Sequence, residues 1–253
     1  MSTPEVPDRA VVILVRPENP ENIGLAARAM KNTGFSELRL AGIRRFSPKA
    51  YRTAVHAEDI LDGAKIFPTL EGATADLHFI AASTAKRRKI ATWVEWDEAA
   101  ERIEGLPSTA RIGLLFGNER TGLTGAELGR ANLVFTIPQA RRQPSYNLGA
   151  AVLLTLYTLF SRIQEGRGLP ARKGDAPLPR REQDATIDRL IAKLSGRGFI
   201  HSTNRDHVAA WVRDYFGRTA MTDRDRGFLL AVFDKMTKNR DIERGKEPGH
   251  GRL

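Results

Sequence analysis

The sequence predicts an α/β domain built on a mostly parallel sheet, followed by a small helical domain. Three observations lead to this prediction. Short apolar runs in the first two-thirds of the chain are continuous rather than alternating, as in strands that are buried on both faces. Segments with helical periodicity separate these runs. After a stretch rich in glycine, proline and charge, only helical periodicity continues.

The apolar runs are the expected strands. Most of them contain β-branched or aromatic residues, which favour a sheet. They are Ala10–Val15, Leu38–Ala41, Leu77–Ala82, Ile112–Phe116 and Leu133–Ile137.

Helices are expected between and after these strands. In Asn22–Asn32 the apolar residues recur at i, i+3, i+4 and i+7 from Ile23. The segment Asn147–Ser161 is apolar nearly all round, which places it in the core, at a subunit interface, or both. Weaker helical patterns cover Glu58–Phe67, Trp96–Ile103 and Gly125–Ala131.

The chain divides into three parts on this pattern. Residues 1–163 form the α/β domain. Residues 164–181 hold three glycines and three prolines among charged residues and are expected to be a linker. Residues 182–253 carry three amphipathic stripes, which begin at Ile187, Val208 and Phe228. A helical unit this small has a limited core of its own, so we expect it to pack against another surface.

Charge favours a polyanionic partner. The chain has 40 Lys and Arg against 30 Asp and Glu, a formal net charge of +10. Basic side chains that neutralise phosphates release counterions, so nucleic acid fits this surplus, although solubility alone is the other interpretation. Residues 164–253 hold 19 basic and 13 acidic residues, which indicates that the C-terminal part contacts RNA.

Composition also narrows the chemistry and the compartment. Without cysteine there is no disulfide, thiolate metal site or cysteine nucleophile, and a reducing cytoplasm suits such a chain. The N-terminus has no signal-peptide pattern, and the apolar stretch Leu148–Phe160 is too short to span a bilayer. The five histidines form no ligand-spaced pair. We therefore expect a cytoplasmic protein with neither a membrane partner nor a metal.

Three polar segments follow expected strands, where ligands of open α/β sheets gather. In Pro17–Arg28, Asn22 can cap the next helix, and Arg28 turns away from the apolar stripe, as a substrate contact or a solvated arginine would. Gly113–Leu123 is a glycine-bounded loop without a P-loop or dinucleotide fingerprint, and a tight turn would look the same. Ile137–Val152 precedes the apolar helix, where Ser145 or Asn147 could be a simple cap.

In their order and spacing, the three segments resemble the SPOUT superfamily, and within it the TrmH/TrmJ-type ribose 2′-O-methyltransferases. Asn22, Gly24 and Arg28 match the family's Asn-x-Gly-x-x-x-Arg motif, and residues 116–123 match Phe-Gly-Asn-Glu-x-x-Gly-Leu. Residues 137–148 match the Ile-Pro and Ser-x-Asn-Leu motif. The match covers roughly residues 10–163. The helical pattern of the C-terminal part is most similar to the TrmJ group, although Tyr146 stands where leucine is common.

The resemblance implies a C-terminal trefoil knot, S-adenosyl-L-methionine (SAM) as cofactor, and a homodimer formed through the knot. It also implies methylation of cytidine or uridine at anticodon-loop position 32 of tRNA. The implied catalytic residues are Asn22, Arg28, Glu119 and Ser145. The implied cofactor-binding residues are Ser83, Thr84, Gly117, Ile137, Ser145, Tyr146, Asn147 and Leu148. RNA contacts are expected at Lys86, Arg88, Arg141 and Arg142.

Arg28 is the family's central catalytic candidate. A guanidinium group keeps its proton at neutral pH, so we expect it to stabilise the developing alkoxide of the ribose rather than act as a plain base. A nearby phosphate would then take the proton, or the arginine itself if its pKa is depressed. In the implied dimer, Arg28 of one subunit serves the cofactor of the other.

Two other functions fit parts of the sequence. The same chemistry on ribosomal RNA would have the same charge pattern, and only the C-terminal helices favour tRNA. A non-catalytic RNA-binding protein could keep the fold, but intact Asn22, Arg28, Glu119, Ser145 and Asn147 argue against it. The scattered histidines give no support to a metal hydrolase.

Overall fold

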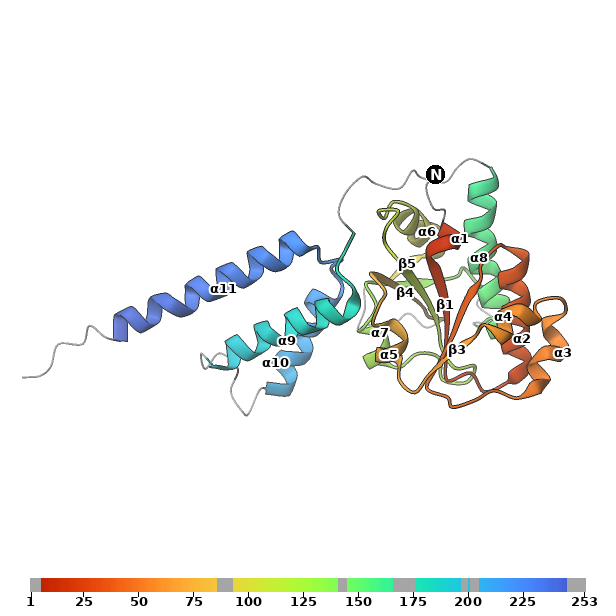
Figure 1. Ribbon diagram of the computed structural model, residues 1–253, viewed down its shortest axis with the longest axis horizontal. Helices are drawn as coiled ribbons and strands as arrows, with labels where there is room; N and C mark the ends of the chain where they lie inside the picture. Colours follow the sequence, from red (N-terminus) through yellow and green to blue (C-terminus); the bar gives the residue numbers. More distant parts are fainter. Residues whose placement is uncertain are drawn as a thin grey trace, which may run out of the picture.

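The computed structural model describes residues 6–85, 93–140, 145–165, 176–196, 200 and 205–244. Within these residues, seven parallel strands form one sheet in the order β3-β2-β1-β6-β4-β7-β5 (Figure 1). The strands are β1 (Ala10–Val15), β2 (Glu37–Ala41), β3 (Lys65–Phe67), β4 (Phe79–Ser83), β5 (Trp93–Glu95), β6 (Ile112–Phe116) and β7 (Leu133–Thr136).

Helices cover both faces of the sheet and then extend beyond it (Figure 1). One core joins α1, α2, α4, α6 and α8 to one face, and a second core joins α5 and α7 to the other. The helices are α1 (Val6–Arg9), α2 (Pro20–Asn32), the 3₁₀ turn η1 (Pro48–Ala50), α3 (Tyr51–Ala54), α4 (Glu58–Asp62), α5 (Leu70–Thr74), α6 (Trp96–Glu104), α7 (Gly125–Leu128), α8 (Leu148–Gln164), α9 (Arg180–Gly196), α10 (Arg205–Gly217) and α11 (Asp223–Arg244).

The predicted α/β class and all five predicted strands are confirmed, with strand ends that move by at most two residues. Two predicted helices are shorter than expected. Gly125–Ala131 is helical only to Leu128, as α7. Glu58–Phe67 forms α4 only to Asp62, where the N–H of Gly63 closes the last turn on Asp59 O. Residues 65–67 instead pair with β2 as an edge strand, because β2 offers unpaired backbone groups there.

The helix α2 begins earlier than its apolar stripe indicated. Asn19, and not the predicted Asn22, is its N-cap: the Asn19 side chain accepts a hydrogen bond from the N–H of Glu21. Pro20 occupies the first helical position, where a missing N–H costs nothing. This leaves the amide of Asn22, which is buried, free for contacts outside the helix.

The helix α8 packs closely against α2. The Cβ of a residue in place of Gly149 would lie 2.6 Å from the Cβ of Leu25, so only glycine permits this approach. Asn147 caps α8 through its side-chain oxygen, which accepts from the N–H of Gly149 at 2.9 Å. The predicted all-apolar helix is confirmed, and its outer face leaves Leu153, Leu154 and Tyr157 exposed.

The C-terminal helices α9, α10 and α11 form a small core of their own around Ile187, Ile191 and Val212. In Figure 1 they lie beside α5 and α7, and α11 points away from the sheet. Helix α9 already begins at Arg180, inside the range expected to be linker, because Arg180 is buried and donates to Arg130 O at 2.6 Å. None of the helices described here is both long and apolar enough to cross a membrane.

Candidate functional site

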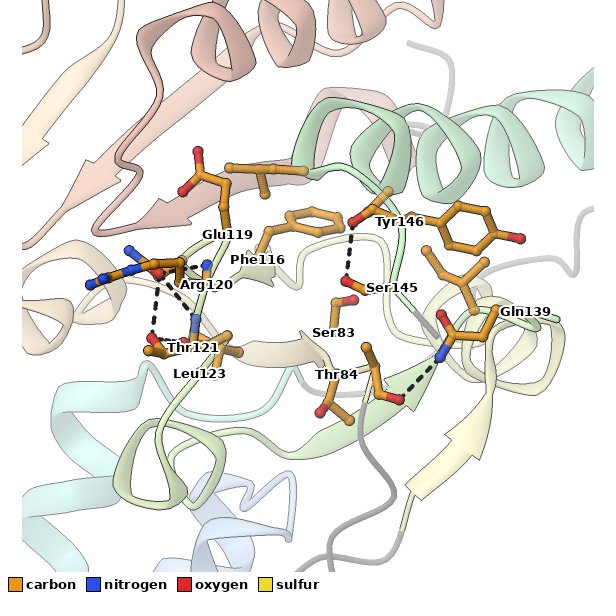
Figure 2. Close-up of a pocket in the computed structure, with 17 residues that line it drawn as sticks. Ser83, Thr84, Phe116, Glu119, Arg120, Thr121, Leu123, Gln139, Ser145 and Tyr146 are labelled. Atoms are coloured by element: carbon orange, nitrogen blue, oxygen red, sulfur yellow. Dashed lines mark hydrogen bonds between the residues drawn. The ribbon is translucent and has the colours of Figure 1, made fainter. Parts of the chain in front are cut away.

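A cavity of about 350 Å³ lies at the carboxyl edge of the sheet. It is formed where β4, β6 and β7 end, together with the start of α8 (Figure 2). Its wall is mainly apolar but contains several hydroxyl groups and a single carboxylate. The lining residues are Ser83, Thr84, Ala85, Phe116, Gly117, Asn118, Glu119, Arg120, Thr121, Gly122, Leu123, Ile137, Gln139, Ser145, Tyr146, Leu148 and Ala151.

The loop after β6 is folded tightly on itself. A Cβ at Gly117 would lie 2.4 Å from backbone atoms of Gly122 and Leu123, and Gly122 has a φ of +67°. The buried Asn118 holds the turn: its side-chain oxygen accepts from the N–H of Arg120, and its amide donates to Arg16 O at 2.9 Å. Glycine at both ends therefore allows the loop backbone to close against the cavity.

A hydrogen-bond chain joins the three motif segments. The Glu119 carboxylate accepts from the backbone N–H of Glu18 at 3.0 Å and of Asn19 at 3.1 Å. It also accepts from the Asn22 side-chain amide at 2.9 Å. The Asn147 amide donates in turn to Asn22 Oδ1 at 2.8 Å. The turn after β1, the loop after β6 and the start of α8 are thus fixed to one another.

These contacts also set the charge of Glu119. Burial alone raises the pKa of its carboxyl group, but hydrogen bonds from the Glu18 N–H and the Asn22 amide favour the charged form. The net pKa of Glu119 is below its ordinary value. An acceptor-only carboxylate with three donors is suited to holding backbone in place rather than to taking up a proton.

The far end of the cavity is built from the end of β4 and from residues that precede α8 (Figure 2). The N–H of Thr84 donates to Phe135 O, which extends the pairing of β4 with β7. The Gln139 amide donates to Ala85 O at 3.1 Å, and the Tyr146 hydroxyl donates to Pro138 O at 2.9 Å. These bonds position the backbone on both sides of the opening.

The structure brings most of the predicted site residues together. All predicted cofactor residues except Asn147 line the cavity, and Asn147 reaches the same site through Asn22. Of the predicted catalytic residues, Glu119 and Ser145 line the cavity, while Arg28 lies exposed on α2 and is not part of the wall. The predicted RNA-binding residues Lys86, Arg88, Arg141 and Arg142 lie outside the described residues.

Several contributors were not singled out from the sequence. Asn118, Thr121 and Gln139 line the cavity. They lie within the motifs that match the family, so their place in those motifs could have identified them. No pattern in the sequence indicated a structural role for Arg16. This residue directly follows β1, has a φ of +50° and forms an ion pair with Glu127. That pair connects the end of β1 to α7 across the sheet edge.

The chain matches the model of the SpoU rRNA Methylase family over residues 9–157. Among similar sequences, the uncharacterized tRNA/rRNA methyltransferase LasT of Escherichia coli is 34% identical over 91% of this chain and 98% of its own. The tRNA (cytidine/uridine/adenosine-2′-O-)-methyltransferase TrmJ of Pseudomonas aeruginosa is 31% identical over 94% of this chain and 96% of its own.

Solved structures of methyltransferases are also similar to this chain. The crystal structure of TrmJ from Z. mobilis ZM4 superposes with a TM-score of 0.77 at 28% identity and covers 90% of this chain and 99% of its own. A structure on the 2-OH methylation of C/U34 on tRNA has a TM-score of 0.51 at 25% identity, covering 62% of this chain and 97% of its own. The first of these similarities extends over the C-terminal helices as well as the sheet.

Proposed function

Because this chain belongs to the SpoU rRNA methylase family, we propose that it is a SAM-dependent methyltransferase that modifies a ribose 2′-hydroxyl of tRNA. The observation that supports this most directly is the cavity whose wall is joined to the Glu119–Asn22–Asn147 chain. We assign the chemistry to residues 1–163, RNA contact to residues 182–253 together with Lys86, Arg88, Arg141 and Arg142, and a linking role to residues 164–181. The cytoplasm is the proposed compartment.

The residues of the cavity fit SAM. Phe116, Leu123 and Ile137 offer apolar surface for a nucleobase, while Ser83 and Ser145 offer hydroxyl groups for polar parts of the cofactor. At Gly117 and Gly122 the loop offers backbone without a side chain to the ligand. When bound, SAM supplies an electrophilic methyl group. A trefoil knot at the C-terminal end of the α/β domain is part of the proposal.

The catalytic role proposed for Arg28 requires a second subunit. Its side chain is exposed on α2 and is not in the wall of the cavity of its own chain. Leu25 on α2 is an exposed apolar side chain, and so are Leu154 and Tyr157 on α8, the helix that packs against α2. A homodimer through this surface would bury them and bring Arg28 to the partner's site, where its charge would stabilise the alkoxide that forms as the 2′-proton leaves.

Position 32 of the tRNA anticodon loop, occupied by cytidine or uridine, is the proposed target. Relatives named as tRNA cytidine/uridine 2′-O-methyltransferases support the nucleotide. Position 34 is a second candidate, since a similar structure is described as methylating C/U34. Ribosomal RNA is a third, since the family model and one relative carry rRNA in their names.

The proposal is tested by incubating the protein with labelled SAM and unmodified tRNA and rRNA, followed by mapping of 2′-O-methyl groups. A label on tRNA at position 32 is the expected result. A label at position 34 or on rRNA selects one of the other substrates. If the protein binds SAM but methylates neither RNA, the enzymatic proposal is wrong.

Arg28→Ala tests the catalytic residue. We expect SAM binding within about twofold of the wild type, and a loss of about 10²–10³-fold in the methylation rate at saturating RNA, as for the loss of a charge that stabilises an oxyanion. Binding is measured by calorimetry and the rate by single-turnover methylation. A variant that methylates at the wild-type rate would exclude this role.

A further inference from the structure

The segment between β2 and α4 is basic and contains no acidic residue. From Gly42 to Ala57 the chain has Arg44, Arg45, Lys49 and Arg52 but no Asp or Glu. All four basic side chains are exposed. In the described part of the chain, none of them forms an ion pair or a side-chain hydrogen bond. We call these four residues the basic patch.

Several other arginines of the described chain are neutralised by carboxylates. The guanidinium groups of Arg39 and Arg111 both pair with Glu37 and Asp76. Arg162 pairs with Glu104. The basic patch therefore differs from these buried or half-buried networks, because its charges face solvent without a counter-charge from the described chain.

Hydrogen bonds anchor the segment that carries the basic patch. The N–H of Lys49 donates to the Ser47 hydroxyl at 3.3 Å, which caps η1. The Thr53 hydroxyl donates to Glu21 O at 2.8 Å, which ties α3 to the start of α2. A flexible loop would lose more conformational entropy on binding a ligand than this anchored segment does.

Aromatic packing stabilises the same segment. The rings of Phe46 and Tyr51 are stacked with centroids 6.3 Å apart, and the Tyr51 hydroxyl donates to Asp62 at 2.7 Å. Lys49 and Arg52 are three residues apart along the continuous η1–α3 helix, on the side opposite the buried Ala50. The two charges thus point outward together.

The patch lies at the edge of the sheet that holds the cavity. It follows the carboxyl end of β2, where the N–H of Arg16 donates to Ala41 O at 2.8 Å. Two strand spacings separate β2 from β6, which is about 10 Å. Ala50 O lies against Gly24 of α2, and Arg28 is one helical turn beyond Gly24 on nearly the same side of the helix.

We propose that Arg44, Arg45, Lys49 and Arg52 bind backbone phosphates of the substrate RNA next to the ribose that Arg28 addresses. This rests on the proposed function and deepens it. RNA is favoured as the occupant because unpaired cations on a rigid support are suited to a regularly charged polyanion. The subunit that supplies Arg28 to a site would supply these phosphate contacts as well.

The test compares two double variants of equal charge. Lys49→Gln/Arg52→Gln removes two patch charges, and Lys65→Gln/Arg102→Gln removes two exposed charges elsewhere, since Lys65 begins β3 at the opposite edge and Arg102 is on α6. Affinity for unmodified tRNA is measured from about 50 to 200 mM salt. The patch variant should lower the slope of log Kd against log salt by about 1.5, and the control should leave it unchanged.

Kinetics separate this role from catalysis. With Lys49→Gln/Arg52→Gln, KM for tRNA should rise about tenfold while kcat stays within about twofold, because phosphate contacts act equally in the ground and transition states. Adding Arg44→Gln/Arg45→Gln should deepen both effects. Melting temperature and SAM binding should not move, because none of these side chains has a partner to lose.

The outcomes distinguish this inference from the proposed function. If the wild type binds and methylates tRNA and the patch variants have its slope and KM, the inference is wrong although the function stands. If the wild type binds no RNA, the proposed function has failed. Equal losses in patch and control variants would indicate a nonspecific effect of net charge and would also overturn the inference.

Discussion

Two carboxylates, Glu119 and Asp76, each accept hydrogen bonds from several donors and so hold neighbouring segments in place. Glu119 accepts hydrogen bonds from two backbone N–H groups and from the Asn22 amide, so its charge fixes the turn after β1. At the opposite edge of the sheet, Asp76 holds the side chains of two arginines. Its carboxylate pairs with Arg39, which is buried, and with Arg111.

Asp76 should make stability depend on pH. Its hydrogen bond with Arg39 is the main cause that lowers its pKa from 3.8 to about 2. A carboxyl group with a lowered pKa stabilises the fold above its unfolded pKa, and this contribution is lost as the pH falls from about 4 towards 2. We expect Asp76→Asn to reduce the free energy of unfolding at pH 7 by about 1 kcal/mol, after allowance for solvent screening of a side chain that is 39% exposed.

Chemical denaturation at pH 7 and at pH 3 checks this expectation. The difference between Asp76→Asn and wild type should shrink at the lower pH. Glu98→Gln is the matched control, because the Glu98–Arg102 pair is exposed on both sides and should change stability by less than about 0.5 kcal/mol. A difference for Asp76→Asn that does not depend on pH would contradict the assignment.

Among the elements, α2 connects the site to its surroundings. Its first turn holds Asn22, its outer face carries Arg28, and its Gly24 receives the η1–α3 segment. A Cβ at Gly24 would lie 2.0 Å from Ala50 O and 2.2 Å from the Thr53 hydroxyl oxygen. The glycine of the Asn-x-Gly motif is therefore required for packing between helices and not for a turn.

Gly24→Ala should destabilise the protein, although alanine favours a helix by about 1 kcal/mol over glycine. The added methyl group must push α3 away, and such overpacking costs about 1–3 kcal/mol. Gly227→Ala is the control: it lies in α11 with no atom within 4 Å of the new Cβ, and should stabilise slightly. Thermal unfolding of both variants decides the matter. If Gly24→Ala were as stable as the wild type, the close approach would be disproved.

On the scale of the whole molecule, the helical extension is held at the amino-terminal edge of the sheet, opposite the cavity. Asn132 directly precedes β7 and bridges the two parts. Its side-chain oxygen accepts from the N–H of Ile80, and its amide donates to Gly217 O and Thr219 O, both at 3.0 Å. The buried Arg180 adds its bond to Arg130 O.

Asn132→Asp should loosen the extension. The new side chain still accepts from the N–H of Ile80 but places an oxygen against two carbonyl groups, and an unsatisfied buried contact costs about 1–3 kcal/mol. We expect faster amide hydrogen exchange in α10, with little change in β1 and β6. Exchange that rises equally in all of these elements would indicate global destabilisation instead of detachment.

The proposed dimer is tested on α8. Leu154→Arg/Tyr157→Arg places two charges among apolar side chains that are 38% and 57% exposed in the single chain. Burying unpaired charge is costly, so we expect a monomer by light scattering. Methylation should be lost with it, because Arg28 would no longer reach a partner's site. A monomeric variant that still methylates RNA would disprove the shared site.

The sequence by itself determined the α/β class, the five longer strands and the three motif segments. These follow from apolar runs and residue identities that act over a few positions. Most of the cofactor-binding residues that the resemblance implied line one cavity, since the carboxyl ends of parallel strands share one edge of the sheet. The sequence could not determine β3, whose three residues are a strand only because β2 has a free edge beside them.

Tertiary structure alone decided which contacts join these segments. Asn19, and not the predicted Asn22, caps α2. The Asn22 side-chain amide is therefore available to bind Glu119 and Asn147, which lie 97 and 125 positions away in the sequence. The exposed position of Arg28 outside the wall of its own cavity also depends on how α2 packs. Local patterns contain no information on such distances, since a side chain's partners are fixed only when the whole chain has folded.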